Sequence, residues 1–340
     1  MLVTQASSCC DICFEDYTTD SLDTSPHAIE CGHIFCGSCI PGFDSQCPMC
    51  REPFSRATRL RVEVAAPLNI EGAAESTSTT GTAQPPSAVD VLSAVQGVVH
   101  QYRALVAERP VIYNAALAGA LNNLSTCLAE FGRSQEALTA AQEAVNLYSD
   151  LVVVRPAVHD ADLAMALDTM SGALSALDRG HEALEAVQEA VDLYRVLATE
   201  RPAAYNADLA QTLDHLSCRL LVLDRLQEGL PPIQESVDLL RPLAEAQPAL
   251  YNSALATALR TLSSYLVELG RNEDALNVIP EAVEIFRGLA DARPAEFSRQ
   301  LTASLDMLAN VLKELGYDEA LEIAQEAAST RAAFGGEGHT

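Results

Sequence analysis

From about residue 88 onward, apolar side chains recur at steps of three and four residues, the spacing that places them on one face of a helix. One such run is Leu117, Leu121, Leu124 and Leu128, and the next is Leu138, Ala141, Val145 and Tyr148. Between the two runs, Gly132 suits the end of a helix and Ser134 suits the start of one. The pattern therefore predicts two antiparallel helices joined by a short turn.

This helix pair repeats with a period of 46 residues. The period is set by two series, Pro110, Pro156, Pro202, Pro248 and Pro294, and Arg133, Arg179, Arg225 and Arg271. Four successive intervals of one length predict a solenoid, in which each unit stacks on its neighbours.

The first helix of each unit has two candidate starting points. One is the proline, and the other is a residue of capping type four positions later: Asn114, Asp160, Asn206, Asn252 or Ser298. The pattern alone leaves both open.

Small residues recur at fixed intervals within each unit. Ser125 is followed by Ala137 after 12 residues and by Ala144 after seven more, and later units keep this spacing. The pattern resembles the tetratricopeptide repeat, whose usual period is 34 and whose helices cross closely at small side chains. The extra 12 residues lengthen both helices. A HEAT-type array has a similar period, but it does not predict these intervals.

The resemblance implies an all-α superhelical solenoid over residues 88–334. It comprises a lone helix from about Val89 to Glu108, four full repeats and a degenerate last repeat from Pro294 that has lost one residue. A short tail, 335–340, follows. Arrays of this family bind protein segments in a concave groove, so we expect a protein or peptide partner. In that array His159, His181 and His215 stand isolated in the sequence, and we expect solvated or core roles for them.

The chemistry lies in the N-terminal region, where eight soft metal ligands form four pairs: Cys10 and Cys13, Cys31 and His33, Cys36 and Cys39, and Cys47 and Cys50. Tetrahedral zinc takes four such ligands at about 2.0–2.3 Å. Eight ligands therefore predict two closed, structural Zn²⁺ sites. Cys9 is an alternative to Cys10, which gives the better two-residue gap.

The order of these pairs, with the stretches Cys31-Gly-His-Ile-Phe-Cys36 and Cys47-Pro-Met-Cys-Arg51, resembles the RING finger family. The resemblance implies a small α+β cross-brace domain over residues 10–54, after a tail at 1–9. By the cross-brace, Cys10, Cys13, Cys36 and Cys39 share one zinc, and Cys31, His33, Cys47 and Cys50 share the other. Residues 55–87, rich in small and polar side chains from Gly72 to Ser87, predict a flexible linker.

RING fingers act as ubiquitin ligases, so the resemblance implies binding of a ubiquitin-charged conjugating enzyme and no nucleophile in this chain. Ile12 and Pro48 match the family's hydrophobic contacts, with Met49 beside Pro48, and Phe43 stands near the place of a usual tryptophan. Arg51 matches the basic linchpin, whose planar fork donates to two acceptors at once. Ile12 and Phe43 could instead fill the core between the zincs, and Arg51 could be an ordinary solvated side chain.

One departure supports a second hypothesis, a non-catalytic interaction scaffold. Only seven residues separate Cys39 from Cys47, and they include Pro41 and Gly42. Both residue types disfavour the short helix that lines the family's partner groove.

Composition narrows the partners. The net charge is −26, and residues 88–340 carry 17 basic and 36 acidic side chains, which disfavours nucleic acid. A basic or apolar peptide is the expected occupant of the groove, and self-association is compatible with either hypothesis. Lys313 is the single lysine beside 20 arginines. The scarcity of lysine could protect a ligase from modifying itself, and a biased codon composition explains it equally well.

Paired metal-type cysteines, with Cys127 and Cys218 as small buried hydrophobes, predict a reducing compartment. The first residues lack the pattern of a signal peptide, and no apolar run is long enough to span a membrane. We therefore expect the protein in the cytoplasm, the nucleus or both.

Overall fold

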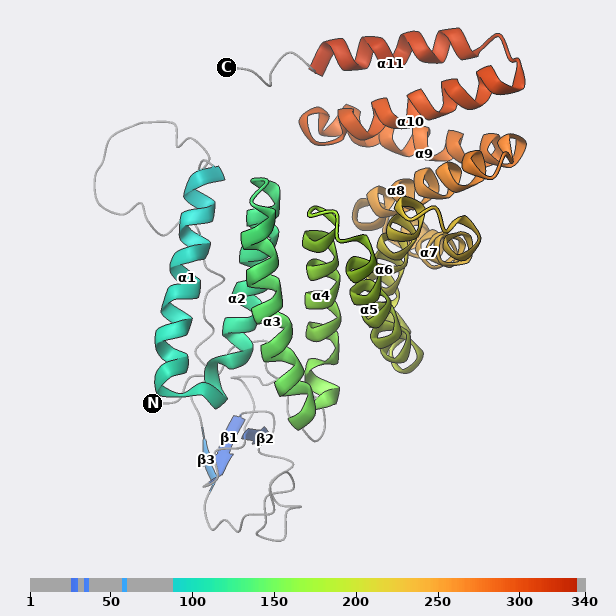
Figure 1. Ribbon diagram of the computed structural model, residues 1–340. Coiled ribbons are helices and arrows are strands. Elements are labelled where there is room, and N and C mark those ends of the chain that lie inside the picture. The colour runs from blue at the N-terminus through green and yellow to red at the C-terminus, as the bar shows by residue number, and fades with distance from the viewer. Residues whose placement is uncertain (1–25, 30–33, 37–56, 60–87, 335–340) are drawn as a thin grey trace. The chain divides into compact units, whose positions relative to one another are not determined.

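The computed structural model describes residues 26–29, 34–36, 57–59 and 88–334 (Figure 1). The chain divides into two units, Met1–Gln84 and Pro85–Thr340. Each is described by itself.

The described part of the first unit is a three-stranded antiparallel sheet. Its strands are β1 (Pro26–Ile29), β2 (Ile34–Cys36) and β3 (Ala57–Arg59), in the order β2-β1-β3. Pro26 pairs with Cys36 and Ala28 with Ile34, so β1 and β2 form a hairpin. Ile29 pairs with Ala57, which places β3 on the other edge of β1.

The second unit is an all-α array, and eleven helices lie in its described residues. They are α1 (Ala88–Glu108), α2 (Pro110–Glu130), α3 (Ser134–Val154), α4 (Pro156–Ser175), α5 (Gly180–Glu200), α6 (Pro202–Val222), α7 (Leu226–Ala246), α8 (Pro248–Glu268), α9 (Asn272–Ala292), α10 (Pro294–Leu315) and α11 (Ala320–Phe334). α1 precedes four helix pairs, α2 to α9, and α10 and α11 form the last pair. No helix among the described residues is both long and apolar enough to cross a membrane.

The choice between the two helix starts is settled in favour of the proline in every unit. Each of α2, α4, α6, α8 and α10 begins at its proline, whose missing N–H costs nothing in the first turn. The residue four positions later lies inside the helix and does not cap it. Ser298 shows the alternative use of such a side chain, because its hydroxyl donates to the carbonyl of Pro294 at 2.6 Å.

The second helix of a unit begins near the predicted point, but without the expected serine cap. Ser134 is the first residue of α3, and Arg133 occupies the capping position without a capping hydrogen bond. The Arg133 guanidinium instead pairs with Glu136 in the first turn at 2.6 Å. The periodic arginines of the later units repeat this contact, as Arg179–Glu182, Arg225–Glu228 and Arg271–Asp274.

The turn between the two helices of a unit needs a left-handed residue. Gly132 and Gly270 supply it with φ values of 68° and 70°, as the sequence predicted for Gly132. In the two middle units Asp178 and Asp224 adopt the same conformation, at 58° and 57°. A side chain in this region costs about 1–2 kcal/mol for most residues, and aspartate tolerates it better than most.

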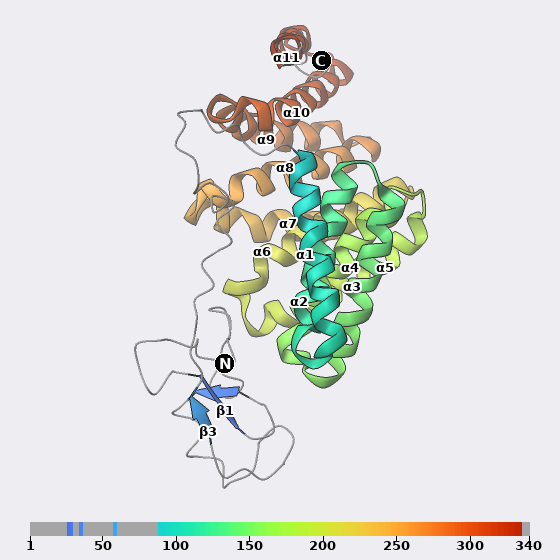
Figure 2. The ribbon, with the colours of Figure 1, turned by 90° about the vertical axis from the view of Figure 1, so that its left-hand side faces the viewer.

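The helices form two rows, which Figures 1 and 2 show stacked unit after unit. The first-helix row is α2, α4, α6, α8 and α10, and the second-helix row is α1, α3, α5, α7, α9 and α11. The backbones of consecutive first helices come close to one another, whereas those of consecutive second helices do not come comparably close in the described array. The first-helix row is therefore the inner row of the stack.

The predicted small residues lie where the helices cross. Ser125, Ala137 and Ala144 are at most 1% exposed, and the Ser125 hydroxyl donates to the carbonyl of Ala137 at 2.8 Å. Larger side chains fill the space beside these crossings, among them the fully buried Tyr265 and Phe286. The core thus runs along the whole array, which is how a solenoid stabilises units that could not fold alone.

Arginine–glutamate bridges link consecutive helices of the second-helix row. The bridges are Arg103–Glu143, Arg195–Glu235, Arg241–Glu281 and Arg287–Glu326, with N–O distances of 2.5–2.8 Å. The first three span 40 residues and the last spans 39, because the final unit has lost one residue. Between α3 and α5 the arginine position is held by Ser149, so Glu189 lacks the equivalent partner.

Candidate functional site

Two regions are candidates: the predicted zinc domain and the first-helix row. In the zinc domain, Cys36 ends β2, whereas Cys10, Cys13, Cys31, His33, Cys39, Cys47 and Cys50 lie outside the described residues. The same holds for Ile12, Phe43, Pro48, Met49 and Arg51. Among the residues that are described, no three His, Cys, Asp or Glu side chains gather as a metal site.

Cys31 and His33 fall in the sequence between β1 and β2, outside the described residues, and Cys36 ends β2. The assignment of the eight ligands to two zincs stays a prediction. Seven thiols and one imidazole are a donor set that suits zinc.

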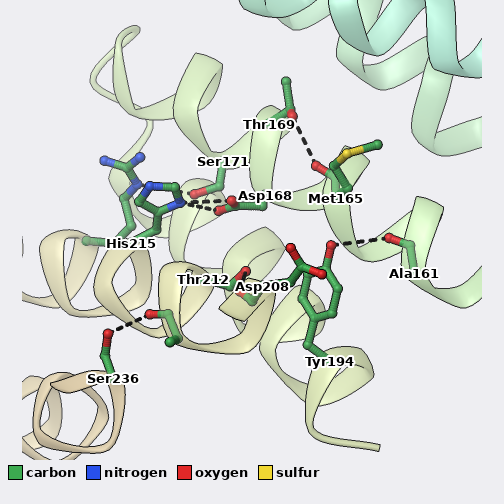
Figure 3. Close-up of polar contacts among 12 residues, drawn as sticks. Ala161, Met165, Asp168, Thr169, Ser171, Tyr194, Asp208, Thr212, His215 and Ser236 are labelled. Atoms are coloured by element: carbon green, nitrogen blue, oxygen red, sulfur yellow. Dashed lines mark hydrogen bonds and ion pairs between the residues drawn. The ribbon is translucent and has the colours of Figure 1, made fainter. Parts of the chain in front are cut away.

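In the array, polar side chains connect neighbouring members of the first-helix row (Figure 3). His215 of α6 reaches across to Asp168 of α4, with its Nδ1 at 2.8 and 2.9 Å from the two carboxylate oxygens. Burial by itself would lower the pKa of His215, but the hydrogen bond and charge of Asp168, together with the charge of Asp214, raise it overall. The contact with Asp168 thus favours the protonated imidazole of His215.

Arg219 lies one turn after His215 and makes a second bridge from α6 to α4. Its Nε donates to Ser171 at 3.2 Å, and its Nη1 donates to Ser175 at 3.0 Å. Both partners are neutral hydroxyls, so this guanidinium keeps its full charge within the row.

Asp214 is the most deeply placed carboxyl of this region, with 8% of its surface exposed. Burial raises its pKa, against the lowering effects of the Thr261 hydroxyl and the His215 and Arg260 charges. Its Oδ1 is buried without a hydrogen-bond partner among the described residues, and so is the Nε of Arg260 in the next first helix. A buried polar atom without a partner costs about 1–3 kcal/mol.

Sequence reasoning missed this arrangement, because it treated His215 as isolated. His215 and Asp168 are 47 residues apart, which is one repeat plus one position, so the repeat register itself contained the signal. His159 is also partnered, through Asp162 at 3.2 Å. His181 is exposed, as expected.

The two cysteines of the array are free thiols and only partly buried, so the expectation of buried hydrophobes overstated their burial. Burial raises the pKa of the Cys218 thiol to about 11, which keeps it protonated and unreactive at neutral pH. Cys218 therefore adds no nucleophile to the region.

Comparison with known proteins gives a family match for the N-terminal region and a fold match for the array. Residues 9–52 match the zinc-RING finger domain family. No curated protein sequence gives a significant match. The array is similar to the crystal structure of BtubC (BKLC) from P. vanneervenii, with a TM-score of 0.58, 18% identity, and coverage of 75% of this chain and 95% of that one.

Two further solved structures extend the likeness. Aspartyl phosphate phosphatase F from Bacillus subtilis has a TM-score of 0.51 at 15% identity, over 69% of this chain and 55% of that one. A Podosopora anserina kinesin light chain structure with nearly identical TPR-like repeats has a TM-score of 0.48 at 15% identity, over 65% of this chain and 96% of that one. At these identities the likeness concerns the fold. Residues 9–52 therefore match a zinc-RING finger, and the array has the fold of stacked TPR-like helix pairs.

Proposed function

We propose that this protein is a RING-type ubiquitin ligase. The observation that carries the proposal is the zinc-RING match over residues 9–52, with its eight metal ligands and the Cys47-Pro-Met-Cys-Arg51 ending. Two bound Zn²⁺ ions would supply structure, tying the ligand pairs into one docking surface. The TPR-like array would bind the substrate protein, and the linker would let the two parts meet.

Each working residue has a distinct task in this proposal. Ile12, Phe43, Pro48 and Met49 would contact the ubiquitin-charged conjugating enzyme. Arg51 would donate hydrogen bonds to the conjugating enzyme and to ubiquitin at once, which fixes their relative orientation. The gain in rate would come from holding the thioester in an attack-ready arrangement, an effect of orientation that needs no nucleophile in this chain.

The reaction would take place in the cytoplasm or the nucleus, where the cysteine ligands stay reduced. The scarcity of lysine fits a ubiquitin ligase, because Lys313 and the N-terminus would be its main sites of self-modification.

A second function is favoured by one specific observation. The seven residues between Cys39 and Cys47 include Pro41 and Gly42, which leaves little room for a helical wall beside the partner groove. In this alternative the zinc domain is a non-catalytic module, and the protein is an interaction scaffold.

Ubiquitin-chain formation separates the two functions. The zinc-loaded full chain is mixed with ubiquitin, ATP, an activating enzyme and a panel of conjugating enzymes, and free and attached chains are measured. Chain formation that exceeds the ligase-free reaction with at least one conjugating enzyme supports the ligase. A uniformly inactive panel, with zinc bound, supports the scaffold.

A further inference from the structure

Exposed apolar side chains are concentrated at one place on the array. Of the 14 large apolar side chains that are exposed among the described residues, six lie at the two turns that join α1 to α2 and α3 to α4. We call these six the valine edge: Leu105, Val111, Ile112, Val153, Val154 and Val158. Val111 is 91% exposed and Val153 is 85% exposed, so neither belongs to the core.

The members of the valine edge are neighbours in space. Each of the helices α1 to α4 packs on the next, and the two turns lie at the same end of this group, the lower end in Figure 1. Val111 and Ile112 are in the first turn of α2, and Val153 and Val154 end α3 beside it. Together the six side chains expose roughly 500 Å², which is near the upper limit for the largest apolar patch on a monomer. Such a patch can form the centre of an interface that buries about 800 Å² on each partner.

The later repeats show that the fold does not require this apolar surface. The positions equivalent to Val111 are held by Ala203, Ala249 and Ala295, and those equivalent to Val153 by Thr199, Glu245 and Asp291. At the three later turns of the same kind, Leu250 is the single exposed large apolar side chain. Because these turns join the same helix ends with small or acidic residues, the branched side chains of the first two turns need another explanation.

Charge distinguishes the valine edge from the rest of the chain. Its two turns, residues 105–113 and 151–159, hold one acidic and two basic side chains. The three later turns, 197–205, 243–251 and 289–297, hold four acidic and two basic side chains. Two copies of a chain with a net charge of −26 repel one another, and at the valine edge this repulsion is absent.

Two adjacent charges at the valine edge are complementary to themselves. Glu108 and Arg109 are both exposed, and neither has an ion-pair partner among the described residues. At the last turn of this kind, by contrast, Arg293 pairs with Glu296 at 2.9 Å. In a twofold contact residue i of one copy meets residue j of the other and the reverse, so each Glu108 can face the Arg109 of the second copy.

We propose that the valine edge is the contact surface of a homodimer, in which the same edge of two copies meets around a twofold axis. The apolar side chains form the centre of the contact, and the Glu108–Arg109 pairs form its rim. The contact uses the ends of helices, so it leaves the first-helix row free in both copies. This inference is independent of ubiquitin ligase activity, and a chain without that activity would form the same dimer.

The test is the molar mass of the zinc-loaded full chain, measured by sedimentation equilibrium over a range of concentrations. We expect the mass to rise from that of one chain to that of two as the concentration passes through the micromolar range. A mass of one chain up to about 100 μM would overturn the proposal, because a weaker contact is not a specific dimer.

Two variants with the same added charge locate the contact. V111D/V153D places two aspartates at the valine edge, and T199D/A203D places two at equivalent exposed positions of the α5–α6 turn. We expect V111D/V153D to raise the dissociation constant of the dimer about tenfold or more, since a desolvated carboxylate would oppose the contact, and T199D/A203D to change it by less than about twofold. Circular dichroism checks that both variants stay helical. A dimer that withstands V111D/V153D, or that both variants weaken equally, would overturn the proposal.

Charge reversal tests the twofold arrangement. E108R alone and R109E alone should each weaken the dimer, because like charges then face one another. An equimolar mixture of the two variants restores opposite charges at both pairs, so it should associate at least about threefold more tightly than either variant alone. A mixture no tighter than its components would contradict the twofold contact.

Discussion

The hydroxyl of Tyr265 occupies the space that a side chain at Gly229 would need. A Cβ at residue 229 would lie 1.8 Å from that hydroxyl oxygen, far inside van der Waals contact. The hydroxyl donates to the carbonyl of Ser217 at 2.6 Å, so it cannot simply move away. In the units where this small position is alanine, as at Ala137 and Ala275, the residue 36 positions later is Ala173 or Val311. The glycine and the tyrosine are thus a matched pair.

Substitution of Gly229 by alanine is expected to destabilise the array by about 3 kcal/mol, because overpacking at a rigid crossing has no low-energy escape. In the double variant G229A/Y265V the loss should be clearly smaller than the sum of the two single losses. Urea denaturation measures the free energy of unfolding of G229A, of Y265V and of the double variant.

Gly172 provides the matched control, since a Cβ there would meet nothing within 4 Å. As Gly172 lies inside α4, G172A should raise the free energy of unfolding by about 0.5–1 kcal/mol through helix propensity. If G229A proved as harmless as G172A, the packing described for Tyr265 would be wrong.

The gap in the bridges of the second-helix row gives a second prediction. Replacing Ser149 by arginine should create the missing bridge to Glu189 and stabilise the array by up to about 1 kcal/mol, the usual range for an exposed ion pair. Thermal unfolding at low and high salt tests it, with S149Q as the uncharged control. A gain that survives high salt undiminished, or that S149Q reproduces, would show that the bridge is not its cause.

The pair of His215 and Asp168 makes the stability of the array depend on pH. Because the folded pKa of His215 is raised, its contribution is fully present below the unfolded value of about 6.5 and is lost as pH rises through the folded pKa. NMR titration of His215 should give a pKa above the unfolded value of about 6.5, and D168N should lower that pKa. If D168N left the pKa of His215 unchanged, Asp168 would not be the cause of its raised value.

Much of the array could be predicted from the sequence, and the remainder shows what a repeat pattern lacks. The 46-residue period predicted the position of every helix pair, because each unit must present the same apolar surfaces to its neighbours in order to stack on them. It left the helix start open between Pro110 and Asn114, since both suit a first turn, and the structure places the start at the proline. The link from His215 to Asp168 needed knowledge of which row is inner. The positive φ values of Asp178 and Asp224 could not be predicted from the sequence. Only glycine, which the other units carry at this position, is a clear sequence signal for a left-handed turn between the two helices.

The zinc domain has the opposite balance. Metal coordination restricts residue type and spacing, so the sequence predicts a complete ligand set, but Cys36 alone among these ligands lies in a described strand. The ligand assignments and the conjugating-enzyme contacts stay predictions.

The roles of Ile12 and Arg51 are tested by alanine substitution. Each of I12A and R51A should lower ubiquitin-chain formation about tenfold or more, because an anchor contact or an orienting hydrogen bond is lost. Zinc content should stay unchanged in both variants. Loss of metal together with activity would make these residues structural parts of the domain.

The central claim is that two zinc ions hold the N-terminal region as a docking surface, and native mass spectrometry of the purified full chain tests it most directly. The account predicts two zinc ions per molecule, both removed by a strong chelator together with conjugating-enzyme binding. A folded chain that carries fewer than two, or that binds a conjugating enzyme equally well without metal, would contradict it.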